Sequence, residues 1–116
     1  MTDLSMKFDT AFEKVKQEMD GILLSAPLLI RQYTSHLTLS HGKFARARAV
    51  LACAMAEEGY IHTDAIIFAA VIEMLHLATL VHDDIMDDAD LRRGVETLQK
   101  KFGKRKAVIC GDYLLA

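Results

Sequence analysis

Acidic side chains gather at one point of this 116-residue sequence, where Asp83, Asp84 and Asp87 follow closely on one another. On an α-helix that advances about 100° per residue, Asp83 and Asp87 lie about 40° apart, and His76 lies about 20° from Asp83. Like charges crowded on one stripe raise carboxylate pKa values and oppose folding unless a cation neutralises them. The spacing therefore predicts a metal site.

Oxygen ligands without sulfur favour a hard cation, and we expect Mg²⁺ in preference to zinc or copper. Magnesium shares its coordination shell with substrate phosphate, so two aspartates one turn apart suit the binding of a diphosphate. A calcium EF-hand loop is poorly supported, because Ile85 stands where the loop needs an oxygen and Asp88 where it needs glycine. The structural alternative is a solvated acidic helix end.

Two basic pairs offer further phosphate contacts. Lys43 and Arg46 lie one turn apart, and Arg92 and Arg93 follow the aspartates. Guanidinium groups bind phosphate oxygens through two parallel hydrogen bonds. Each set alone also fits a structural role, as a solvated surface pair, a charge complement at a helix C-terminus or, for His76, a buried core histidine. We expect a shared function because all of them occur together in one short chain.

Composition favours a helical fold for the elements that position these residues. The chain is 52% hydrophobic and 26% charged with a formal net charge of −2, so it can form one core and lacks the basic excess of nucleic-acid binders. Few glycines and prolines interrupt it, which predicts an all-α fold and a single helical unit over residues 1–116. Apolar spacing and capping residues predict helices over residues 4–23, 25–37, 43–58, 63–88, 97–103 and 104–116.

The caps of these helices are Ser25, Thr63 and Thr97, with Gly59 closing the third. Residues 65–81 approach the length of a membrane span but contain two polar residues, so we expect a buried central helix and no transmembrane segment. The N-terminus has no apolar export signal, which predicts a cytoplasmic protein. Two isolated cysteines, Cys53 and Cys110, are expected to be buried in a reducing compartment.

The sequence resembles the trans-isoprenyl diphosphate synthase (polyprenyl synthetase) family. Residues 83–87 match its aspartate-rich DDxxD motif, residues 92–94 its RRG motif and residues 111–116 its GDYLLA signature. Lys43 and Arg46 occupy the basic positions of its GGKxxRP element. The resemblance covers essentially the whole chain but about the N-terminal third of a typical member. It implies the N-terminal helices of an antiparallel helical bundle of the isoprenoid synthase type.

The resemblance also implies a Mg²⁺-dependent prenyltransferase that condenses isopentenyl diphosphate with an allylic diphosphate, head to tail, into a trans-polyprenyl diphosphate. The residues that would hold Mg²⁺ on the allylic diphosphate are Asp83, Asp84 and Asp87. Arg92 would also contact this diphosphate. The residues that would bind isopentenyl diphosphate are Lys43, Arg46, His76 and Arg93.

Family members shorten their product with a bulky aromatic one turn before the aspartates, where this chain has Ala78 and Thr79. A medium or long product is therefore expected. The second aspartate-rich motif of the family does not occur in these residues, so the isolated chain would hold half of an active site. Apolar faces are expected to drive it into a homodimer or a helix-swapped oligomer, for example around Val108, Ile109, Leu114 and Leu115.

Two alternatives remain open. One is a non-catalytic partner or regulatory subunit of a heteromeric prenyl diphosphate synthase. The other is a purely structural helical bundle, which does not account for acidic and basic clusters in the same chain.

Overall fold

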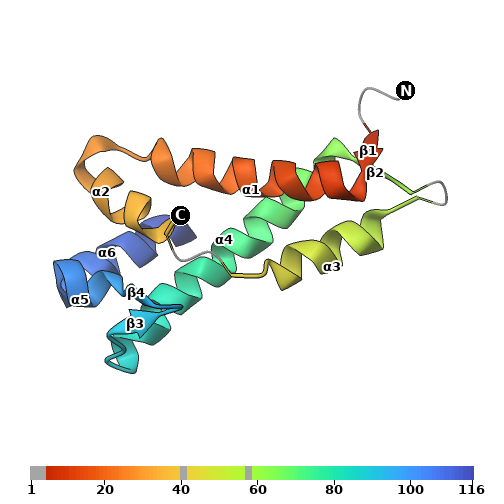
Figure 1. Ribbon diagram of the computed structural model, residues 1–116. Coiled ribbons are helices and arrows are strands. Elements are labelled where there is room, and N and C mark those ends of the chain that lie inside the picture. The colour runs from red at the N-terminus through yellow and green to blue at the C-terminus, as the bar shows by residue number, and fades with distance from the viewer. Residues whose placement is uncertain (1–4, 40–41, 57–58) are drawn as a thin grey trace. The chain divides into compact units, whose positions relative to one another are not determined.

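The computed structural model describes residues 5–39, 42–56 and 59–116, and it is helical apart from four very short strands (Figure 1). The expected all-α class is confirmed. The elements are β1 (Ser5–Lys7), α1 (Phe8–Leu24), α2 (Leu28–Leu37), α3 (Ala45–Ala54), β2 (Tyr60–His62), α4 (Thr63–Met86), β3 (Leu91–Arg92), β4 (Val95–Glu96), α5 (Leu98–Phe102) and α6 (Lys104–Leu115).

The contacts of the chain divide it into two compact units. The first comprises the residues up to Gly21 together with Lys43–Glu73, and the second comprises Ile22–Gly42 together with Met74–Ala116. Both α1 and α4 contribute to both units, so the division does not separate the chain into sequence-continuous domains. The single helical unit expected from the sequence stays a prediction.

A short strand pair in the first unit was not predicted. β1 pairs antiparallel with β2, with Met6 opposite the fully buried Ile61. The first helix therefore starts at Phe8, whereas apolar spacing predicted a start at Leu4, which lies outside the described residues. Three-residue strands are too short to show the alternation that would reveal them in a sequence.

Helix α3 is shorter than predicted, and one of its residues that was expected to be buried is exposed. It ends at Ala54 instead of Glu58, which lies outside the described residues. Its buried side chains are Ala47 and Leu51, whereas Cys53 is exposed. The prediction that Cys53 is buried is wrong, because the buried face of this helix follows the four-residue step from Ala47 to Leu51.

In the second unit, α2 begins after Pro27, which is its N-cap without a side-chain hydrogen bond, so the expected cap at Ser25 is wrong. The Thr34 hydroxyl is fully buried and donates to the Leu23 carbonyl at 2.6 Å.

Thr97 caps α5 as predicted, since its Oγ1 accepts from the Lys100 backbone N–H at 3.3 Å.

Helix α6 ends this unit and is amphipathic. It buries Ala107, Cys110 and Leu114 but leaves Val108, Ile109 and Leu115 exposed. The expected exposed apolar face is thus present, with the exception of Leu114, which is 9% exposed.

Helix α4 is the longest element, and its 24 residues span about 36 Å. With a mean hydropathy of 1.9 over its most apolar window, it is the one helix of the described ranges that could cross a membrane by length and composition. Only 39% of that window is buried, so the expected burial of this helix is partial. Exposed apolar residues on it include Ile67, Phe68, Val71 and Leu75.

The burial of the Cys110 thiol predicts that the free energy of unfolding depends on pH. Cys110 is fully buried, and desolvation raises its pKa from 9.0 to about 11. The folded protein holds this proton more tightly than the unfolded chain, so the full stability is present below pH 9.0 and declines up to about pH 11. We expect a loss of about 2 to 3 kcal/mol from this group.

Urea unfolding of the wild type and of Cys110→Ala at about pH 8 and about pH 10.5 measures this loss. The variant should lose less stability than the wild type between the two pH values. Equal losses in the two proteins would show that the thiol is not the titrating group.

Candidate active site at the end of helix α4

Helix α4 ends in a turn that displays the first and last aspartates of the motif. The Asp87 N–H donates to the Asp83 carbonyl at 2.9 Å, and the Ala89 N–H donates to the Asp84 carbonyl at 2.9 Å. Asp88 takes a left-handed conformation with φ 52°, and its N–H donates to the Ile85 carbonyl at 3.3 Å. These bonds form a Schellman motif, which fixes the chain direction after the helix.

The Asp83 and Asp87 side chains are exposed, one turn apart on this helix end. In the described part of the chain neither carboxylate forms a salt bridge. Two exposed carboxylates at this spacing fit Mg²⁺, which takes one or two protein carboxylates and completes its shell with water and substrate phosphate. Over residues 5–39, 42–56 and 59–116, however, no three His, Cys, Asp or Glu side chains form a group that could hold a metal.

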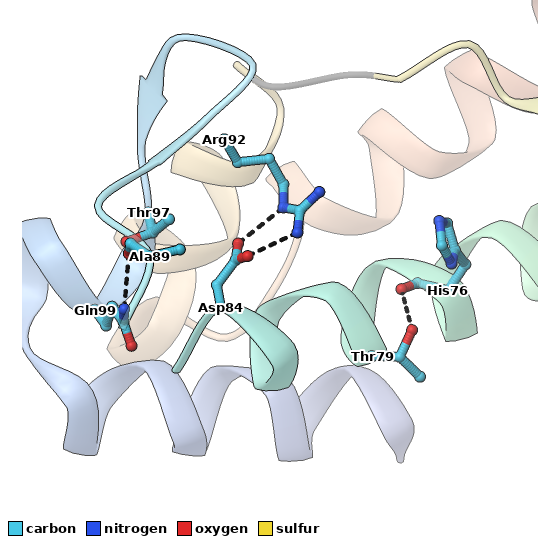
Figure 2. Close-up of polar contacts among 7 residues, drawn as sticks. All are labelled: His76, Thr79, Asp84, Ala89, Arg92, Thr97 and Gln99. Atoms are coloured by element: carbon cyan, nitrogen blue, oxygen red, sulfur yellow. Dashed lines mark hydrogen bonds and ion pairs between the residues drawn. The ribbon is translucent and has the colours of Figure 1, made fainter. Parts of the chain in front are cut away.

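Asp84 has a different environment from the other two aspartates. It is 8% exposed and accepts from Arg92 Nε at 2.8 Å and Arg92 Nη2 at 2.7 Å, a two-point ion pair visible in Figure 2. The hydrogen bond to Asp84 raises the pKa of Arg92, with smaller contributions from the charges of Asp83 and Asp87. The sequence placed Asp84 with the metal and Arg92 with the substrate, and the structure pairs them with each other.

Arg92 stands on a tight hairpin directly after the helix. β3 and β4 pair antiparallel, and the two residues between them, Arg93 and Gly94, have φ values of 52° and 79°. Positive φ at both positions forms the type I′ turn that fits two-residue hairpins, which explains the glycine of the RRG motif. Arg93 Nη2 lies 3.1 Å from the position that a Cβ on Gly42 would occupy.

His76 lies two turns before Asp83 on α4 and is partly exposed. Its carbonyl accepts from Thr79 Oγ1 at 2.6 Å. Figure 2 shows this contact on the part of α4 that precedes Asp84. The helical spacing places His76 and Asp83 on the same side, as predicted.

Lys43 and Arg46 belong to the other unit, at the start of α3. Lys43 precedes the helix, because Phe44 takes a left-handed conformation with φ 57° and α3 begins only after it. Both cationic side chains are exposed, and the first turn of α3 has no acidic residue. A helix N-terminus with two cations is a suitable environment for an anion.

Several residues of this region were not identified as candidates from the sequence. Glu73 is 6% exposed, and its carboxylate accepts from the Ala47 N–H at 2.9 Å near the start of α3. In the second unit, His36 Nε2 donates to the Glu96 carbonyl at 2.6 Å, and Gln99 is buried beside the hairpin. Their partners are distant in the sequence, and spacing alone gives no signal for such contacts.

Comparison with known proteins gives a consistent result. Residues 27–116 match the family described as Polyprenyl synthetase. The chain is 36% identical to heptaprenyl diphosphate synthase component 2 of Bacillus subtilis, covering 96% of this chain and 34% of the relative. It is 40% identical to nonaprenyl diphosphate synthase of Mycobacterium tuberculosis, covering 89% of this chain and 31% of the relative.

Solved structures show the same relationship. The chain superposes on heptaprenyl diphosphate synthase from Staphylococcus aureus with a TM-score of 0.84 and 31% identity, covering 95% of this chain and 35% of that one. For a decaprenyl diphosphate synthase from Rhodobacter capsulatus the TM-score is 0.78 at 31% identity, with 91% and 33% covered. The isoprenoid synthase type of fold is therefore confirmed. The chain spans about a third of the length of these relatives.

Proposed function

Because the chain belongs to the polyprenyl synthetase family, we propose that it is the part of a trans-prenyl diphosphate synthase that binds Mg²⁺ and diphosphate. The complete protein would condense isopentenyl diphosphate with an allylic diphosphate. The observation that carries this proposal is the helix end at Asp83 and Asp87, where two exposed carboxylates without a salt bridge among the described residues adjoin a charged guanidinium held by Asp84.

The residues of this chain divide the task among them. Asp83 and Asp87 would hold Mg²⁺, and the metal would supply positive charge beside the leaving allylic diphosphate. Asp84 orients Arg92, whose side chain is 31% exposed and has donors left for a phosphate oxygen. Arg92 thus stabilises the negative charge that develops on the leaving diphosphate.

Four further residues bind the second substrate in this proposal. The support for each is its residue type and its exposed or partly exposed side chain, since cationic groups and histidine bind diphosphate oxygens. These residues are Lys43, Arg46, His76 and Arg93.

Binding of inorganic pyrophosphate tests the proposal without the rest of the synthase. Isothermal titration calorimetry of the wild type should show pyrophosphate binding that requires Mg²⁺. A purely structural helical bundle would show no such binding, and this outcome would remove the proposed function.

Two relatives, from Bacillus subtilis and Geobacillus stearothermophilus, are named component 2 of a heptaprenyl diphosphate synthase, which fits the alternative of a subunit of a heteromeric synthase. The exposed apolar residues of α6 support a second proposal, association of this chain with a copy of itself. Light scattering checks this, and a strictly monomeric sample would contradict it.

A further prediction concerns the chain length of the prenyl product. Ala78 is fully buried, so an aromatic there would disrupt the packing of the second unit, whereas Thr79 is exposed on α4. Small residues at this point of the helix leave room for a medium or long chain. We expect Thr79→Phe in the complete synthase to shift the products to shorter chains, as measured by chromatography of the dephosphorylated prenols. Thr79→Ser is the control, and an unchanged distribution in Thr79→Phe would contradict the prediction.

A further inference from the structure

The carbonyl of Ala89 accepts two side-chain hydrogen bonds directly after the end of α4. Thr97 Oγ1 donates to it at 2.8 Å and Gln99 Nε2 at 2.7 Å, and Figure 2 shows the bond from Gln99. Both donors are more than nine-tenths buried, with exposures of 6% for Thr97 and 9% for Gln99. The Thr97 N–H also donates to the Asp90 carbonyl at 2.9 Å. The two ends of the segment 89–97 are therefore fastened to each other.

This segment carries the hairpin with Arg92 and begins two residues after Asp87. Each strand of the hairpin has two residues, and a two-stranded ribbon this short is not stable alone. Its position must come from other contacts. Among the described residues, the contacts that hold it include the Arg92 pair with Asp84, the His36 bond to the Glu96 carbonyl, the Ala89 N–H bond to the Asp84 carbonyl and the two side-chain bonds to the Ala89 carbonyl.

We propose that Thr97 and Gln99 are positioning residues of the diphosphate site, which hold the Ala89 carbonyl and thereby set Arg92 against Asp84. The proposal deepens the proposed function and rests on it for its effect on ligand binding. Neither residue touches the diphosphate. They act through the turn after α4 and the hairpin.

The surroundings of Gln99 support a role for its donor group. Gln99 Oε1 and His36 Nδ1 are both buried without a partner among the described residues. His36 Nε2 donates to a carbonyl, and in the neutral imidazole Nδ1 is then an acceptor like Gln99 Oε1. Both residues line one cavity of about 20 Å³, which has room for a single water.

An apolar side chain of the same length at position 99 would bring no buried acceptor to this cavity. Hydrophobic packing alone therefore favours a residue other than glutamine. Gln99 contributes the Nε2 hydrogen bond to the Ala89 carbonyl, which an apolar residue does not form.

Two variants test the proposal in the full 116-residue chain. Gln99→Met keeps the side-chain length but removes the donor, and Thr97→Val removes the hydroxyl. We expect each to weaken Mg²⁺-dependent pyrophosphate binding about 10-fold, the effect of weakening one charge-assisted hydrogen bond from Arg92 to the diphosphate. Thr97→Ser keeps the hydroxyl and should restore the wild-type affinity.

Thr34→Val is the matched control, because Thr34 Oγ1 also donates to a backbone carbonyl from a fully buried site, and its partners are the carbonyls of Leu23 and Arg31, outside segment 89–97. It should lower the free energy of unfolding and leave pyrophosphate affinity unchanged. An equal loss of affinity in Thr34→Val and Thr97→Val would mean that both act through general stability, and it would overturn the proposal.

A readout without ligand separates this proposal from the proposed function. In nuclear magnetic resonance spectra the Arg92 Nε–H, which donates to Asp84, should give a distinct and slowly exchanging signal. Gln99→Met and Thr97→Val should speed its exchange, and an unchanged signal in both would overturn the positioning role. If the wild type failed to bind pyrophosphate, the proposed function would fail, and the Arg92 signal would still decide whether Thr97 and Gln99 position the hairpin.

Discussion

Asp83→Asn is expected to lower the affinity of the chain for pyrophosphate in the presence of Mg²⁺ by about 100-fold or more, because it removes one of the two carboxylates that we propose to hold the metal. Loss of a group that only orients a metal ligand costs about 10- to 100-fold, so loss of a ligand itself should reach or exceed that range. The substitution leaves folding nearly unchanged, since Asp83 is exposed and forms no salt bridge in the described part of the chain. Isothermal titration calorimetry with and without Mg²⁺ measures the effect.

Asp88→Asn is the control for charge. It changes the net charge equally and lies near the same helix end, but its ion pair with Lys104 at 2.7 Å is exposed on both sides and contributes little stability. Asparagine tolerates the left-handed conformation at this position, so the turn is kept. Affinity losses of the same size in Asp88→Asn and Asp83→Asn would show a general electrostatic effect instead of a metal site.

The parts of the fold that could be predicted are those with a local signal in the sequence, either repeated apolar residues or a capping residue. The apolar residues of α4 recur over its whole length, and Thr97 caps α5 in the way its hydroxyl suggests. The strand pair of β1 and β2 could not be predicted, because it joins segments more than fifty positions apart. Similarly, the left-handed Phe44 shortens α3 at a residue type that normally avoids this conformation.

For the candidate site, residue types predicted the chemistry but not the pairing. An arginine after three aspartates can bind a carboxylate or a phosphate, since both offer two oxygens at matching separation. Only the hairpin geometry shows that Arg92 meets Asp84, and that the carboxylates of Asp83 and Asp87 form no salt bridge among the described residues. No sequence pattern indicates a role for Gln99, because its proposed role depends on a backbone carbonyl ten residues away.

Gly111→Ala is expected to destabilise the protein by about 1 to 3 kcal/mol, the usual cost of overfilling a packed site. A Cβ on Gly111, in α6, would lie 2.6 Å from Cδ2 of the His82 ring and closer still to its Nε2. The ring has little room to move, since His82 Nε2 is 3.3 Å from Asp112 Oδ1 and the side chain is 29% exposed. Because His82 precedes Asp83, the displaced ring would also disturb the end of α4.

Gly21→Ala provides the opposite case, since Gly21 lies within α1 and a Cβ there meets nothing within 4 Å. Alanine is favoured over glycine inside a helix, so this variant should gain about 0.5 to 1 kcal/mol. Urea unfolding of both variants measures the difference. Since the helix preference acts equally at both positions, the gap between the variants isolates the clash with His82. Gly111→Ala with wild-type stability or better would mean that α6 does not approach α4 this closely.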